Sequence, residues 1–75
     1  MKIDEVRKAL EQQPRLIPGG ELVRILNYSL PTVRRLAETY SIRVYRTRPN
    51  GHRRYVREDV LAILPQLRDH GHALR

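Results

Sequence analysis

Eight arginines and a single acid, Glu38, occupy the stretch from residue 34 to residue 57. These charges leave the stretch with a formal +7, which equals the formal net charge of the whole chain. The guanidinium group is a planar fork of hydrogen-bond donors that fits phosphate oxygens and the major-groove edge of guanine. Because the stretch has arginine and no lysine, we predict that it forms a surface for contact with nucleic acid.

Other chemistries find little support in the sequence. The chain has no cysteine, so thiol nucleophiles, disulfides and thiolate zinc sites are excluded. The adjacent acids Asp4-Glu5 and Glu58-Asp59 stand where helices are predicted to begin, and complementarity to the helix dipole explains them. We therefore expect no enzyme activity, no catalytic residues, no cofactor and no metal site. No apolar run approaches a membrane span, so we expect a cytoplasmic, nucleoid-associated protein with no membrane partner.

The elements that must position the arginines begin with helices. Residues 2–13 carry Ile3, Val6 and Leu10 at helical spacing, which predicts an additional N-terminal helix. Pro14 and Pro18 frame a connector in which Ile17 is the expected buried residue. The whole chain is expected to form one domain.

Residues 20–39 carry the pattern of a helix-turn-helix. A short apolar helix follows Gly20, and Ser29 is a plausible N-cap for a second helix over residues 30–39. The outer face of this second helix presents Thr32, Arg34 and Arg35. Two short helices joined by a tight turn, the second with outward arginines, are typical of DNA binding, and bidentate arginine–guanine contacts are the commonest specific ones.

Residues 42–56 change to a β pattern around an Asn50-Gly51 turn, which predicts a two-stranded hairpin that protrudes as a basic wing. Its polar candidates for contact with DNA, mainly with phosphates, are Arg43, Arg46, Arg48, Asn50, His52, Arg53 and Arg54. A closing helix over residues 58–68 buries Val60 and Leu64, with an end or a kink at Pro65. Residues 69–75 are expected to form a tail. The predicted fold class is α+β, mostly α: a small winged helix-turn-helix.

Three groups of residues also carry a family resemblance. They are Glu21-Leu22, Thr32-Val33-Arg34-Arg35, and Gly51-His52-Arg53-Arg54-Tyr55 with the following Glu58-Asp59-Val60. With them, the stretch from residue 20 to residue 64 resembles the winged helix-turn-helix of MerR-type regulators, of excisionase-like factors and of small BldC-like regulators. The resemblance implies that the second helix enters the major groove and that the wing lies along the adjacent backbone or minor groove.

The resemblance does not extend to the long dimerising helix or the effector domain of full MerR regulators. Effector sensing and obligate two-fold dimerisation are therefore not expected. Instead we expect a sequence-specific double-stranded DNA-binding protein, a transcriptional regulator, with self-association of several copies on adjacent sites. Two alternatives stay open: an excisionase-like recombination or DNA-architectural factor, and a module that docks on a protein partner through residues 2–13.

Several arginines and tyrosines also have purely structural interpretations. Arg34 and Arg35 fit a solvated helix face, and Arg43 and Arg46 fit edge-strand charges that discourage aggregation. Arg57 is expected to support the start of a helix or to pair with an acid. Packing is the favoured role of Tyr55. For His52, contact with DNA and no contact are equally favoured.

Overall fold

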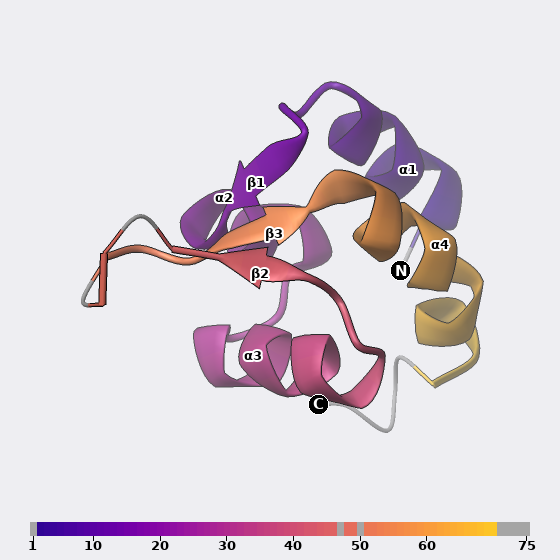
Figure 1. Cartoon of the computed structure of the whole chain (residues 1–75). Helices are drawn as coiled ribbons and strands as arrows, with labels where there is room; N and C mark the ends of the chain where they lie inside the picture. Colours follow the sequence, from indigo (N-terminus) through magenta and orange to yellow (C-terminus); the bar gives the residue numbers. More distant parts are fainter. Residues whose placement is uncertain (1, 47, 50, 71–75) are drawn as a thin grey trace.

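The computed structural model describes residues 2–46, 48–49 and 51–70, with side chains up to residue 67. Within them, helices surround a small antiparallel sheet in a mostly helical α+β fold of winged-helix type (Figure 1). The elements are α1 (Ile3–Glu11), β1 (Leu16–Pro18), α2 (Gly19–Leu26), α3 (Leu30–Thr39), β2 (Val44–Tyr45), β3 (Arg54–Val56) and α4 (Arg57–His70). The predicted fold class is thereby confirmed. Asn50 and residues 71–75 lie outside the described residues.

The sheet is built around β3, which pairs with β1 on one side and with β2 on the other. The β2–β3 pair is the predicted hairpin, although its strands are shorter than expected. Its loop points away from α1 and α4 in Figure 1. Strand β1 lies in the segment expected to be only a connector, with Ile17 fully buried as predicted. Pro18, which has no N–H, is accommodated because β1 is an edge strand.

Helices α2 and α3 pack against each other and form the predicted helix-turn-helix unit. Asn27 ends α2 in the left-handed conformation, with φ of 60°. Ser29 is the N-cap of α3, and its Oγ accepts a 3.3 Å hydrogen bond from the backbone N–H of Thr32. Local capping chemistry therefore fixes where the arginine-bearing helix begins.

Helix α1 completes the core. Leu10 is fully buried, and Ile3 and Val6 pack partly buried against the same cluster. Helix α1 packs on α4, and a 2.8 Å hydrogen bond from the Arg57 backbone N–H to the Arg15 carbonyl joins the first residue of α4 to the segment that follows α1. The N-terminal helix is thus part of the fold.

Helix α4 continues through Pro65, so of the two outcomes predicted there, an end or a kink, the end is wrong. Pro65 is exposed, while Leu64 and Leu67 are both fully buried. Burying each leucine stabilises the fold by about 1.5–3 kcal/mol. Together they offset the cost of about 3 kcal/mol for a proline inside a helix. No helix among the described residues is long and apolar enough to span a bilayer.

Candidate nucleic-acid interface

Arg34 and Arg35 lie exposed on the face of α3 that turns away from the core. Their orientation follows from the buried stripe of the same helix, formed by Val33, Leu36 and Ala37. Successive residues of a helix are rotated by about 100°, so the two guanidinium groups leave the helix in different directions. The structure thus places both predicted groove arginines on the outer surface.

Thr32, the third candidate of this helix, takes part in its N-terminal cap. Its Oγ1 lies 2.9 Å from Oγ of Ser29, in addition to the backbone hydrogen bond that Ser29 accepts. The half-buried side chain is therefore engaged within the turn between α2 and α3. Thr32 thus helps to fix the start of α3, and any contact of its hydroxyl with a base would compete with the hydrogen bond to Ser29.

The adjacent wing arginines Arg53 and Arg54 point to opposite faces of the sheet. Side chains alternate along a strand, and Arg54 begins β3 while Tyr55 follows it into the core. Arg53 is half-buried on the side of Tyr55, which is the side of α3, and Arg54 is exposed on the other face. The sequence analysis assigns Arg53 and Arg54 the same role in DNA contact, whereas the register of β3 directs their side chains to opposite faces of the sheet.

Arg43 is bound within the protein. Its backbone N–H donates to Oδ2 of Asp59 at 2.8 Å, and its guanidinium donates to both carboxylate oxygens at 2.9 and 3.0 Å. These hydrogen bonds hold the pKa of the Asp59 carboxyl below its ordinary value, and the same pairing raises the pKa of Arg43. The guanidinium of Arg43 is therefore held by Asp59 at the base of the hairpin.

The remaining wing candidates lie near the hairpin turn. Arg46 donates a 3.2 Å hydrogen bond to the carbonyl of Pro49, and the carbonyl of Arg48 accepts one from Gly51 at 2.9 Å. The side chains of Arg48 and His52 are exposed. Asn50 lies outside the described residues, so its predicted contact is not located.

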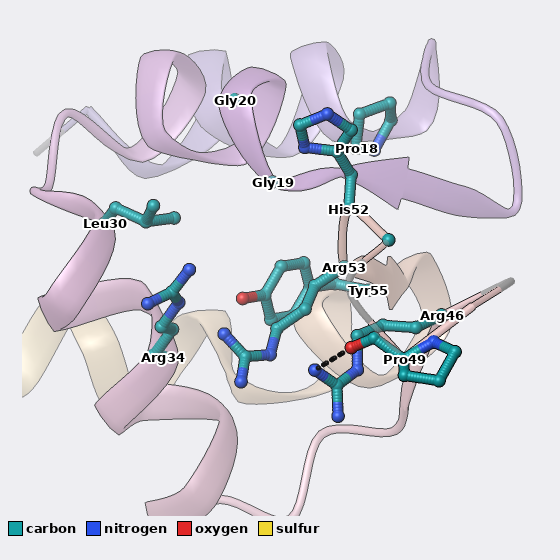
Figure 2. A pocket seen from close by; sticks show the side chains of 11 residues that line it. Pro18, Gly19, Gly20, Leu30, Arg34, Arg46, Pro49, His52, Arg53 and Tyr55 are labelled. Atoms are coloured by element: carbon teal, nitrogen blue, oxygen red, sulfur yellow. Dashed lines mark hydrogen bonds between the residues drawn. The ribbon is translucent and has the colours of Figure 1, made fainter.

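A hollow of about 380 Å³ brings three arginines from separate parts of the sequence together. Arg34 enters it from α3, whereas Arg46 and Arg53 enter from the wing (Figure 2). Gly19 and Gly20, at the start of α2, form another wall, and Tyr55 also lines the hollow. None of the described residues that line it is acidic. The hollow is therefore an electropositive site shared by the helix-turn-helix and the wing.

Two features of this hollow escape the sequence-based list of site residues. The start of α2 could be suspected from Gly19-Gly20 before a helix, since helix N-termini attract anions. The hydroxyl of Tyr55 could not, because the sequence favours packing for this residue. Its ring is buried as that interpretation predicts, yet its hydroxyl has no hydrogen-bond partner among the described residues.

The Arg57 side chain is bonded within the protein, to a backbone carbonyl and not to the acid that was one of its expected partners. Its Nη1 donates a 2.6 Å hydrogen bond to the carbonyl of Gln13, near the end of α1. Among the described residues, no group of histidines and acids could hold a metal ion. Comparison with family models, with curated proteins and with solved structures found no match to this chain.

Proposed function

We propose that this protein binds double-stranded DNA in a sequence-specific manner and acts as a transcriptional regulator of the winged helix-turn-helix type. In this proposal α3 enters the major groove, which is about 12 Å wide in B-DNA and admits a helix. The β2–β3 hairpin then lies on the adjacent backbone. The resemblance to MerR-type proteins points in the same direction.

One observation carries the proposal: Arg34 of α3 and Arg53 of the wing line the same hollow. Two elements distant in sequence thus direct cations toward one region of space. A DNA duplex offers both the groove and the neighbouring phosphates to such a pair of elements. RNA duplexes are a poorer fit, because their deep, narrow major groove excludes a helix.

The direct test is selection of binding sites from random DNA duplexes, with the wild-type protein and with Arg34→Ala and Arg35→Ala in parallel. We expect enrichment of one sequence motif by the wild-type protein. An arginine that reads a base loses the preference at one position when it is replaced, whereas an arginine on a phosphate loses affinity uniformly. Enrichment of no motif would refute sequence-specific binding.

The same selected duplex tests the expected self-association of several copies. A footprint that widens beyond one copy as protein is added supports it, and a footprint that stays one copy wide at saturation contradicts it. Circular permutation of the site then separates a regulator from an excisionase-like architectural factor. Strong bending at tandem sites favours the latter role.

A further inference from the structure

The hydroxyl of Tyr55 is a buried donor without a protein partner. The residue is only 1% exposed, and its hydroxyl has no hydrogen bond among the described residues. A phenylalanine would fill the same space without the cost of an unpaired polar group. Such exceptions call for an explanation, and a ligand that supplies the missing partner is one.

The surroundings of this hydroxyl are cationic. Arg34 and Arg53 line the hollow described above together with Tyr55, and they also line a second, smaller hollow beside Tyr55, to which the acid Glu38 contributes as well. Figure 2 shows the hydroxyl directed into the space between these two side chains. An anion in this space would lie near the neutral hydroxyl donor of Tyr55 and the charged guanidinium donors of Arg34 and Arg53.

The N-terminus of α2 adds a third contribution. A Cβ on Gly19 would lie 3.4 Å from Cε1 of Tyr55, so the hydroxyl end of the ring is beside the first turn of this helix. Pro18, at the N-cap position, provides no side-chain hydrogen bond, and Gly20 borders open space. The helix dipole therefore favours negative charge on this side of the hollow.

We propose that the hollow binds one phosphodiester of the DNA backbone and that the hydroxyl of Tyr55 donates a hydrogen bond to one of its oxygens. This inference rests on the proposed function and makes it more specific. Arg34 then contacts the same phosphate, so it is an anchor, and Arg35 is the arginine of α3 that remains available to read a base. Arg53 contacts the phosphate from the wing.

The first experiment compares the wild-type protein with Tyr55→Phe and with the control Tyr45→Phe, which removes a hydroxyl from a half-exposed tyrosine of β2. Inorganic phosphate is titrated while the amide signals of Gly20 and Arg53 are followed by NMR. We expect saturable shifts in the wild-type and control proteins. Affinity should be roughly tenfold weaker or worse in Tyr55→Phe, as for the loss of a hydrogen bond to a charged group. Equal titrations of all three proteins would overturn the inference.

The second experiment asks whether the phosphate belongs to DNA. Duplexes carrying the selected site receive one neutral methylphosphonate at successive positions. One position should weaken binding by the wild-type protein at least as strongly as Tyr55→Phe does, and should have little further effect on that variant. Losses that combine independently at every position would overturn the inference and leave DNA binding itself intact.

The two proposals fail differently. If the wild-type protein binds no duplex at low salt, the proposed function is refuted, and the assignment to a backbone phosphate with it. If DNA binds and Arg34→Ala loses one base preference instead of uniform affinity, only the anchor role is refuted. A uniform loss for Arg34→Ala, with a lost base preference for Arg35→Ala, supports the assignment.

Discussion

Arg43 binds Asp59 through both its backbone amide and its guanidinium group, with three hydrogen bonds between 2.8 and 3.0 Å. Arg43 immediately precedes β2, and Asp59 lies in the first turn of α4. One carboxylate therefore fixes the base of the hairpin relative to the helix that closes the core. Although the Arg43 side chain is 57% exposed, its donors are directed at α4.

This pair predicts a pH dependence of stability. Hydrogen bonds from Arg43 lower the pKa of the Asp59 carboxyl in the folded protein, so the unfolded chain takes up this proton at higher pH. The stabilisation is fully present above the ordinary carboxyl pKa of about 3.9 and is lost as pH falls through the lower folded value. Urea unfolding at pH 7 and pH 3 should show a smaller loss for Asp59→Asn than for the wild-type protein. Equal losses would mean that the pair contributes nothing.

The salt dependence of DNA binding should reflect the arginines that the protein leaves available. Arg43 is paired with Asp59 and Arg57 is bonded to Gln13, which leaves six arginines of the basic stretch: Arg34, Arg35, Arg46, Arg48, Arg53 and Arg54. With Arg34 and Arg53 on one shared phosphate, Arg35 on a base and the other three on one phosphate each, the slope of log K against log salt concentration is about −4.

Two alanine variants check this count. Arg54→Ala should make the slope shallower by about one, whereas Arg43→Ala should change it little. Fluorescence anisotropy over a salt series measures both. A wild-type slope that is steeper by about one, with equal changes in the two variants, would show that Arg43 contacts DNA after all.

Removing the buried Tyr55 hydroxyl should stabilise the free protein. Because no described protein group pairs with it, Tyr55→Phe is expected to raise the unfolding free energy by about 1 kcal/mol. The thermal midpoint would then rise by about 4–8 °C. Scanning calorimetry in phosphate-free buffer tests this, with Tyr45→Phe as the matched control. A fall in Tm would indicate that the hydroxyl is paired within the folded protein.

Because α4 continues beyond Pro65, alanine substitutions at Gln66 and Leu67 should change the stability of the fold by different amounts. Leu67 is fully buried, so Leu67→Ala should lower the unfolding free energy by about 2–5 kcal/mol. Gln66 is exposed, and Gln66→Ala should change it by less than about 0.5 kcal/mol. Chemical denaturation of the two variants gives the comparison. Similar effects would mean that the chain leaves the core after Pro65.

Arg57 should matter for folding more than for binding. Arg57→Ala removes the hydrogen bond from Nη1 to the Gln13 carbonyl and is expected to cost about 1 kcal/mol of unfolding free energy. The affinity of the folded variant for DNA should stay close to that of the wild-type protein. A large loss of affinity without a loss of stability would move Arg57 into the interface.

Periodicity in the sequence predicted the helical part of the fold well. The bounds of α3 and its capping serine follow from local rules, namely an apolar stripe, Ser29 at the N-cap and Pro31 in the first turn. Strand β1 does not follow from such rules. Its three residues are too few to display a period, and Pro18 argues against a strand unless the edge position is known.

For the candidate site, the sequence indicates residue types but not their arrangement in space. The partners Arg43 and Asp59 are 16 residues apart in the sequence. They meet because β3 pairs with β2 in the hairpin and continues directly into α4. The separation of Arg53 from Arg54 depends on which residue of β3 faces the core, and Tyr55 decides that. The sequence shows which residues carry positive charge. The register of β3 determines which of the wing arginines line the hollow.

Strand β1 runs directly into α2, with no residue between Pro18 and Gly19, and the Gly19 N–H donates to the carbonyl of Arg53 at 3.2 Å. This hydrogen bond therefore ties the start of the helix-turn-helix to the wing. We expect an insertion at this junction to break this bond and to displace α2 and α3 relative to the wing. Because the acceptor is the Arg53 carbonyl, changes in the loop joining β2 to β3 leave this bond in place only where they spare the backbone at Arg53, and the rest of that loop is the segment to exchange when the contacts of the wing are to be altered.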